Sequence, residues 1–127
     1  MNKIIRRGDL WLVDFSPTDG HEQNGVRPAV ILSSDQIDIN ALELAYAVPG
    51  TRTAKTDPET NELLADVIRV EPSKSNGLTS VTYFLCNQLR AVSLRRFTQS
   101  KRLGVLDAHS LFDIEDILIA LLDLGPK

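Results

Sequence analysis

A short stretch near the start of the chain reads Gly20-His21-Glu22-Gln23-Asn24-Gly25-Val26-Arg27-Pro28. An acid and two amides lie between its glycines, and an arginine follows the second glycine. It leads directly into the apolar run 29–32, which predicts a polar loop fixed to the start of a buried strand. Binding and catalytic groups are often found in such loops, because the strand holds rigid what the loop presents. Arg27 stands where loop and strand meet, and its planar, permanently charged guanidinium suits a phosphate or a carboxylate.

A second polar cluster, Thr51-Arg52-Thr53, follows Pro49-Gly50 at the end of a later apolar run. If neighbouring strands of a bent sheet bring both clusters to one rim, then Arg27, Thr51 and nearby backbone N–H groups surround an anion. That arrangement suits a phosphodiester and needs no metal. The alternative is that Arg27 pairs with Glu22 while Thr51 only completes a turn, and composition alone favours this second interpretation.

Several common kinds of site are missing from the sequence. The two histidines, His21 and His109, are far apart, and no Cys/His cluster has the spacing of a zinc site. No glycine-rich loop matches a phosphate-binding loop or a dinucleotide fingerprint, and there is no Gly-x-Ser-x-Gly motif. The acids of residues 57–62 indicate a solvated loop rather than a calcium site. We therefore expect neither a metal nor a cofactor.

The bulk composition is that of an ordinary globule, with 127 residues of which 43% are hydrophobic and 24% charged. We expect residues 1–127 to form one domain without a membrane partner, since no apolar run is long enough to span a bilayer. Residues 1–7 carry charge without the apolar core of a secretory signal. The single cysteine, Cys86, lies in an apolar run, which predicts a small buried hydrophobe in a reducing, cytoplasmic environment.

The formal net charge of −3 is unevenly distributed. Residues 107–127 carry five acids and one base, whereas residues 1–106 carry 13 bases and 12 acids. The acidity thus belongs to the last segment, and the rest of the chain is able to present a local basic face. The alternative, that these charges simply solvate the surface, has equal weight without a fold.

Apolar runs and turn signals predict five strands, over residues 9–15, 27–33, 44–48, 64–70 and 80–85, with residues 89–92 extending the last one past a kink. A short helical turn is expected over residues 35–40 and a mobile polar loop over residues 51–62. Pro49-Gly50 is expected to end the third strand, and Asn76-Gly77 is the strongest hairpin signal in the chain.

The last segment changes to a helical period from about Asp107 onward, with apolar residues at Leu111, Ile114, Leu118, Leu121 and Leu122. Ser110 and Asp113 have the spacing of a capping box, and Gly125-Pro126 predicts the end of the helix. Several short strands and one terminal amphipathic helix predict a mainly β, α+β fold. We expect a small, strongly bent antiparallel barrel with the helix packed on it.

An ordered set of motifs makes the chain resemble the MazF/PemK family of toxin endoribonucleases. The set comprises Arg7-Gly8-Asp9-Leu10-Trp11, Phe15-Ser16-Pro17-Thr18, Gly20-His21-Glu22-Gln23, Arg27-Pro28, Val48-Pro49-Gly50-Thr51 and Asn87-Gln88-Leu89-Arg90-Ala91-Val92, before the leucine-rich final helix. One such piece is weak support, but the ordered set covers nearly the whole chain. The resemblance implies an SH3-like barrel with short connecting helices, a homodimer, a cognate antitoxin and metal-independent cleavage of single-stranded RNA.

By this resemblance, the catalytic arginine and threonine of the family correspond to Arg27 and Thr51. Glu22 matches an acidic loop position that some members use in catalysis. Gly50 stands before Thr51 where many members carry a β-branched residue. The sequence thus departs from the family pattern next to a residue expected to act in catalysis.

Base recognition is expected to come from hydrogen bonds to splayed single-stranded bases. The reason is that the aromatic residues Trp11, Phe84 and Phe112 are expected in the core rather than as stacking platforms. The candidate RNA-binding residues, chosen by type and position, are Gln23, Asn24, Arg52, Thr53 and Lys55. Gln88 and Arg90 are expected to brace the loops or the dimer.

Cleavage without metal requires attack by the 2′-hydroxyl and yields a 2′,3′-cyclic phosphate and a 5′-hydroxyl. Arg27 suits stabilisation of the pentacoordinate state, because a guanidinium offers N–H donors and is a poor base. Glu22 or His21 would serve as the base, and Thr51 would bond a non-bridging oxygen. Two alternatives stay open: a CcdB-type toxin of similar fold that poisons DNA gyrase, and a catalytically dead relative that only binds a partner.

Overall fold

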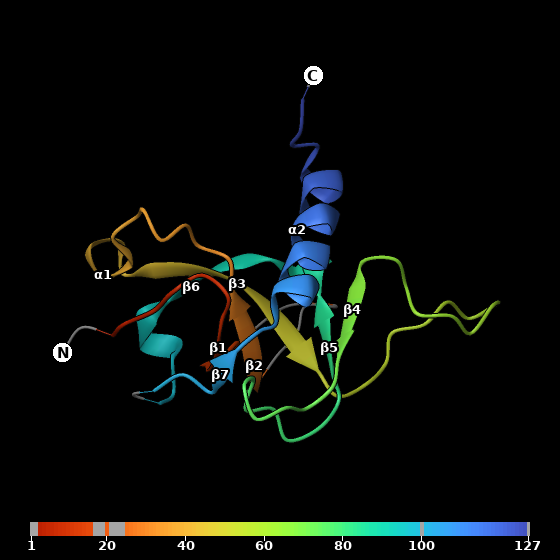
Figure 1. Ribbon diagram of the computed structural model, residues 1–127, viewed down its shortest axis with the longest axis horizontal. Helices are drawn as coiled ribbons and strands as arrows, with labels where there is room; N and C mark the ends of the chain where they lie inside the picture. The colour runs from red at the N-terminus through yellow and green to blue at the C-terminus, as the bar shows by residue number, and fades with distance from the viewer. Residues whose placement is uncertain (1–2, 17–19, 21–24, 100, 127) are drawn as a thin grey trace.

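A computed structural model describes residues 3–16, 20, 25–99 and 101–126. Within them, seven strands form one curled antiparallel sheet in the order β4-β5-β3-β2-β1-β7, and β6 pairs with β3 outside this path (Figure 1). The strands are β1 (Asp9–Asp14), β2 (Val26–Ile31), β3 (Leu44–Thr51), β4 (Val67–Val70), β5 (Thr82–Leu85), β6 (Arg90–Ser93) and β7 (Gly104–Val105). The helices are α1 (Ile39–Leu42) and α2 (Ala108–Leu122), with short 3-10 helices η1 (Cys86–Gln88) and η2 (Leu94–Arg96).

This architecture confirms the predicted fold class, a bent antiparallel sheet with a C-terminal helix packed on it. The sheet is curled into an open half-barrel, and α2 stands over it (Figure 1). Across the described ranges, no helix combines the length and the apolar character needed to cross a membrane.

The long strand β3 organises the sheet. Along one edge it pairs with β2 through residues 47–49. Along its other edge it pairs first with β6 through residues 44–47 and then with β5 through residues 50–51. β3 thus changes its partner along this edge from β6 to β5, and the sheet bends at that change.

The prediction that Pro49-Gly50 ends the third strand is wrong, because β3 continues to Thr51. Gly50 lies opposite Phe84 of β5 in ordinary antiparallel pairing. A Cβ on Gly50 would lie 2.5 Å from Cγ2 of Thr82 and 3.1 Å from Cε1 of Phe84. The glycine therefore serves close packing inside a strand rather than a turn.

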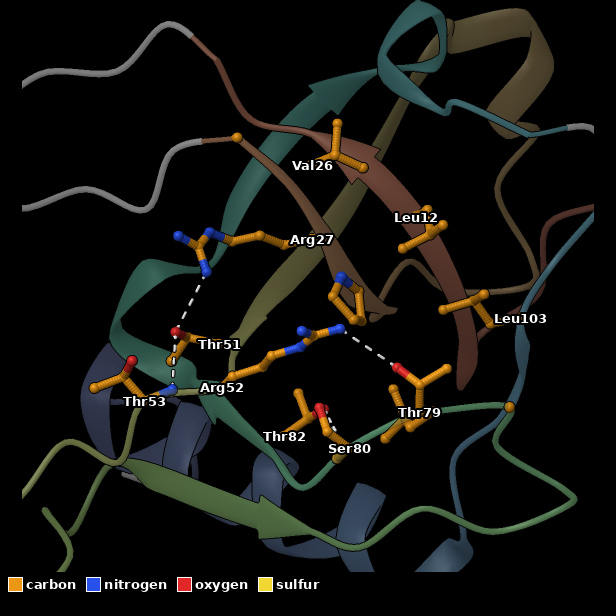
Figure 2. A pocket seen from close by; sticks show the side chains of 14 residues that line it. Leu12, Val26, Arg27, Thr51, Arg52, Thr53, Thr79, Ser80, Thr82 and Leu103 are labelled. Atoms are coloured by element: carbon orange, nitrogen blue, oxygen red, sulfur yellow. Dashed lines mark hydrogen bonds between the residues drawn. The ribbon is translucent and has the colours of Figure 1, made fainter.

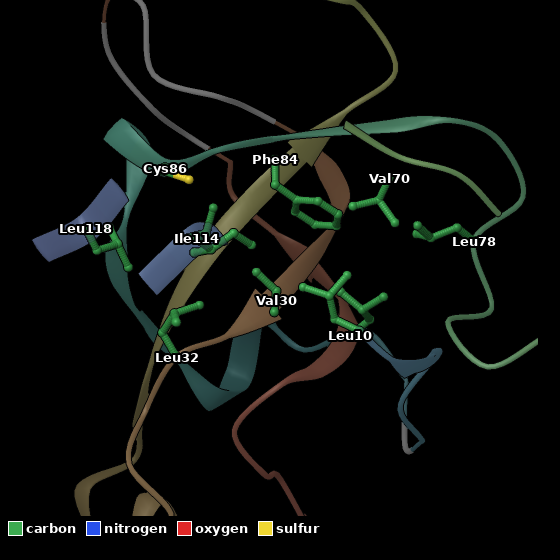
Figure 3. Packing of buried hydrophobic residues seen from close by; sticks show 11 residues of the cluster. Leu10, Val30, Leu32, Val70, Leu78, Phe84, Cys86, Ile114 and Leu118 are labelled. Atoms are coloured by element: carbon green, nitrogen blue, oxygen red, sulfur yellow. The ribbon is translucent and has the colours of Figure 1, made fainter. Parts of the chain in front are cut away.

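Side chains alternate between two buried faces of the sheet. One face is covered by Ile114 and Leu118 of α2 (Figure 3). Its cluster includes Leu10, Val30, Val48 and Phe84. The opposite face has its own cluster, which includes Trp11, Phe15, Ala29, Ala47 and Phe97. Burial on both faces confirms the interpretation of the second strand as a central one.

The expectation that three aromatic residues are core residues holds for two of them. Trp11 and Phe84 are buried, but Phe112 is 66% exposed. In α2, Leu111, Ile114 and Leu118 pack toward the sheet, and Phe112 lies about 100° around the helix from Leu111. The helical period places Phe112 on the outer side, so its apolar character did not indicate burial.

Local signals in the loops were less reliable than the strand pattern. Asn76-Gly77 does not form a two-residue hairpin: β4 and β5 pair, but residues 71–81 connect them and Asn76 is buried. The expected helical turn is later than predicted, with Asp38 capping α1. The two-residue strand β7 was missed, since two residues cannot show a period.

The N-terminus of α2 is capped by Asp107 and not by the predicted capping box of Ser110 and Asp113. An Asp107 carboxylate oxygen accepts a hydrogen bond from the backbone N–H of Ser110 at 2.9 Å. Ser110 already lies in the first turn, so its amide is one of the donors that need a cap. Desolvation raises the pKa of Asp107, but hydrogen bonds from Ser110 outweigh it and leave that pKa below its usual value.

We predict that Asp107→Ala lowers the free energy of unfolding by about 1 kcal/mol at neutral pH. Because the folded pKa of Asp107 is lowered, its charged-state contribution is present above about pH 4 and is lost as pH falls through the folded pKa. Urea denaturation of wild type, Asp107→Ala and Asp107→Asn between pH 7 and pH 3 measures this. The advantage of wild type over Asp107→Asn should shrink toward low pH, and a constant difference would contradict the assignment.

Candidate active site

Arg27 and Thr51, which are 24 positions apart in sequence, meet at one end of the sheet. Arg27 is the second residue of β2 and Thr51 is the last residue of β3. The β2–β3 register pairs Ala29 with Pro49, so two further residues along each strand bring Arg27 opposite Thr51. The Arg27 Nη1 donates a hydrogen bond to the Thr51 Oγ1 at 3.3 Å. The predicted convergence of these two side chains is therefore observed.

The Thr51 hydroxyl is held as an acceptor by two donors. Besides Arg27 Nη1, the backbone N–H of Thr53 donates to Thr51 Oγ1 at 3.3 Å. The side chain is only 5% exposed, which fixes its rotamer by packing. A hydroxyl that accepts two hydrogen bonds still carries its own proton. Thr51 is thus suited to donate that proton to an oxygen of a bound anion.

These two residues line a cavity of about 630 Å³ at the end of the sheet (Figure 2). The lining residues are Leu12, Gly25, Val26, Arg27, Pro28, Thr51, Arg52, Thr53, Gly77, Leu78, Thr79, Ser80, Thr82 and Leu103. Among these described residues are two arginines and no acid or histidine. Two fixed positive charges in this lining favour a negatively charged ligand. The volume exceeds what one phosphate group fills.

The other sequence-predicted site residues divide into three groups. Arg52 and Thr53 line the same cavity as Arg27 and Thr51. Lys55 lies instead in a separate depression beside Asp66, Asn87 and Gln88. The loop residues His21, Glu22, Gln23 and Asn24 lie outside the described residues.

The cavity also contains residues that the sequence analysis did not select, among them Thr79, Ser80 and Leu103. Thr79 and Ser80 follow Asn76-Gly77 closely in sequence. That position after a strong turn signal was the available indication that they lie in a loop able to reach a site. Leu103 comes from a segment near β7. No local pattern predicts that contact, because it depends on a pairing distant in sequence.

Cys86 is not placed to act as a nucleophile. Its side chain is fully buried in the core beneath α2. Burial, with a smaller contribution from the negative charge of Asp66, raises the pKa of the Cys86 thiol to about 12. A nucleophilic cysteine needs a thiolate near neutral pH. The prediction of a buried structural cysteine is confirmed, and across the described ranges no three His, Cys, Asp or Glu side chains group as metal ligands.

We predict that Cys86 in the folded protein does not react with a thiol reagent at pH 8, because it is both inaccessible and protonated. Reaction should become complete in denaturing urea. Absorbance of the released chromophore measures both states. Rapid stoichiometric labelling under native conditions would show that the thiol is exposed.

We further predict that Gly50→Val lowers the free energy of unfolding by about 1–3 kcal/mol, because its side chain overlaps Thr82 and Phe84. Urea denaturation measures the loss, with Gly50→Ala as a smaller step in the same series. Wild-type stability of Gly50→Val would contradict this prediction, because it would show that Thr82 and Phe84 are able to move away at no cost.

Comparison with known proteins gives a family and a fold. The family described as “PemK-like, MazF-like toxin of type II toxin-antitoxin system” matches residues 6–122. Among curated proteins, the chain is similar to “Endoribonuclease MazF” of Staphylococcus epidermidis. The two are 29% identical over 122 residues, which cover 96% of this chain and 94% of that relative.

Solved structures show the same architecture. The MazF (Form-I) crystal structure from Deinococcus radiodurans matches with a TM-score of 0.77 and 26% identity, over 97% of this chain and 100% of that one. An endoribonuclease in complex with its cognate antitoxin, from a mycobacterial species, matches with a TM-score of 0.69 and 19% identity. That match covers 98% of this chain and 100% of the other, and at this identity it shows the shared fold.

Proposed function

This chain belongs to the PemK-like, MazF-like toxin family, and we propose that it is a sequence-specific endoribonuclease that cuts single-stranded RNA, mRNA in particular. Cutting mRNA stops translation and growth until a cognate antitoxin neutralises the toxin. The observation that carries the proposal is the Arg27–Thr51 pair in a cavity whose lining includes a second arginine, Arg52. Such a lining suits the phosphodiester backbone of RNA.

In the proposed reaction, a base removes the proton of the 2′-hydroxyl and the 2′-oxygen attacks the adjacent phosphorus. The bond from phosphorus to the 5′-oxygen breaks, and that oxygen takes up a proton. The products are a 2′,3′-cyclic phosphate and a 5′-hydroxyl. No metal takes part in this scheme. Glu22, for which His21 is an alternative, is proposed as the base from its position in the family motif.

Arg27 and Thr51 act on the charge that accumulates during this reaction. The phosphorus passes through a pentacoordinate state in which the non-bridging oxygens carry extra negative charge. Arg27 stabilises that charge by electrostatics, since a guanidinium offers N–H donors and has no acceptor with which to act as a base. Thr51 donates its hydroxyl proton to a non-bridging oxygen and is held in position by Arg27 and by the N–H of Thr53.

The toxin is proposed to act as one domain in the cytoplasm, as a homodimer with a cognate antitoxin. The solved complex of a related fold with its cognate antitoxin supports the partner. The dimer is supported by an apolar groove of about 670 Å³ beside α2, whose lining includes Tyr46, Phe112, Ile119, Leu122 and Leu124. Each of these five side chains is between 47% and 66% exposed. Exposed apolar area of this kind typically marks a protein interface.

We predict that Arg27→Ala lowers the rate of RNA cleavage by about 100-fold or more, as does loss of a transition-state donor in other enzymes. Thr51→Val, which keeps the shape of the side chain and removes the hydroxyl, should act in the same direction. Arg95→Ala is the matched control. Arg95 belongs to η2, which lies beside the start of β3, whereas Thr51 lies at the opposite end of that strand. Gel analysis of a long RNA, with circular dichroism to verify folding, measures these effects.

The assay is made with purified RNA, an excess of chelator and no other protein. Normal cutting by a folded Arg27→Ala protein would overturn the assignment of Arg27. Absence of cutting by wild type would favour the alternatives of a gyrase-binding toxin or of a partner-binding protein without activity. Loss of wild-type activity in chelator would contradict the metal-independent scheme.

A further inference from the structure

The cavity extends past the Arg27–Thr51 pair into a second half that the proposed chemistry does not use. Arg52 directly follows Thr51, the last residue of β3, and its side chain points to the side opposite to Thr51. Figure 2 shows the Arg52 side chain crossing the cavity toward Thr79, with Thr82 and Ser80 beside it. Leu12 and Leu103 lie across from this group (Figure 2). The second half thus combines one cation, three hydroxyl side chains and an apolar wall.

This half has the composition of a nucleobase site rather than of a second phosphate site. Leu12, Pro28 and Leu103 provide apolar surface against which the flat face of a base is able to pack. The guanidinium plane of Arg52 provides a second surface and a set of N–H donors. A phosphate gains no favourable contact from the apolar wall, whereas the face of an unstacked base is able to pack against it.

The polar groups of this half present donors. The Arg52 Nη2 donates to the Thr79 Oγ1 at 3.5 Å, so the Thr79 hydroxyl accepts there and keeps its own proton. At 3.5 Å this hydrogen bond is weak, so a ligand replaces it at small cost. The Thr82 hydroxyl is committed to the carbonyl of Ser80 at 3.0 Å. A base facing Arg52 therefore meets N–H groups that only an acceptor satisfies, and the Thr79 hydroxyl is able to add an O–H donor.

The wall that carries Thr79 is fixed in position by Asn76. The Asn76 side chain is 4% exposed; it accepts from the N–H groups of Ser73 and Leu78 and donates to the carbonyl of Glu71. These three distances are 2.9, 2.9 and 2.8 Å. Such bonding makes residues 71–78 a rigid loop, and rigid placement is what allows a side chain to discriminate between ligands.

The same loop is locked against the segment before α2. Gly77 has a φ of +69°, and a Cβ there would lie 2.2 Å from the carbonyl oxygen of Leu103. A Cβ on Gly104 would lie 2.3 Å from the carbonyl oxygen of Ser75, whose oxygen also accepts from the N–H of Val105 at 2.8 Å. The two backbones touch without side chains between them. This contact fixes the separation between Thr79 and the apolar wall.

We propose that Arg52 and Thr79 form a base subsite beside the scissile phosphate that selects a keto base, guanine or uracil, over adenine and cytosine. The inference rests on the proposed function for the presence of RNA in the cavity. Guanine offers O6 and N7 and uracil offers O4 to the donors of the subsite. The exocyclic amino groups of adenine and cytosine instead place a donor against the guanidinium of Arg52, which has no acceptor.

The test measures binding and cutting separately. Fluorescence anisotropy with non-cleavable 2′-deoxy heptamers of uracil, adenine or cytosine gives base preference without catalysis. Sequencing the 5′ ends of fragments from a long RNA gives the bases that flank each cut. We expect wild type to favour uracil over adenine in binding by about fivefold or more, and keto bases at one position adjoining the cut.

Three variants separate base reading from general attraction. Arg52→Lys keeps the charge but loses the planar fork, and Thr79→Val removes only the hydroxyl, so both should bind RNA yet lose the keto preference. Thr60→Val, in the exposed turn outside the cavity, is the matched control and should keep it. Identical base preference in all four proteins, or a wild-type preference for adenine, would overturn the subsite.

The outcome also distinguishes this inference from the proposed function. If wild type cuts RNA and Arg27→Ala does not, while the base preference ignores Arg52 and Thr79, only the subsite fails. If no RNA is cut but uracil binding depends on Arg52 and Thr79, the subsite stands and the nuclease proposal fails.

Discussion

The antiparallel register between β2 and β3 is the constraint on which the site depends. It brings Arg27 and Thr51 into contact at the end of the sheet, although they are 24 positions apart in sequence. A slip of one residue would turn Thr51 to the opposite side of β3 and put Arg52 in its place. The register is held by burial on both faces of the sheet, so the geometry of the site is a consequence of the core.

The division of labour between the two arginines follows from the same alternation. Arg27 lies opposite Thr51 at the proposed phosphate position, whereas Arg52 follows the last residue of β3 and extends toward Thr79. One strand end is thereby proposed to supply two functions. Because Gly50 lets β5 approach β3 closely, this strand end stays regular up to Thr51.

Much of this arrangement was accessible from the sequence. Apolar runs identified the strands from β1 to β5, and the change to a helical period identified α2, because burial imposes those periods wherever an element packs on a core. Motif resemblance selected Arg27 and Thr51, and strand alternation explains why they meet. Sequence patterns do not reveal a role that depends on contacts formed only in the folded chain. Gly50 packs closely against Thr82, Asn76 forms hydrogen bonds within its loop, and Leu103 lines the cavity. Glycine and asparagine were taken as turn signals there, whereas they satisfy packing and hydrogen bonding.

The glycine contact between residues 77 and 104 and their opposing backbones has a consequence for divergence among related toxins. Gly77 and Gly104 let two main chains meet directly, and this contact does not involve the side chains at positions 52 and 79. If those two side chains form the proposed base subsite, their exchange would change the accepted base and leave the backbone contact as it is. The proposal therefore allows base preference to change by point mutation within a constant frame.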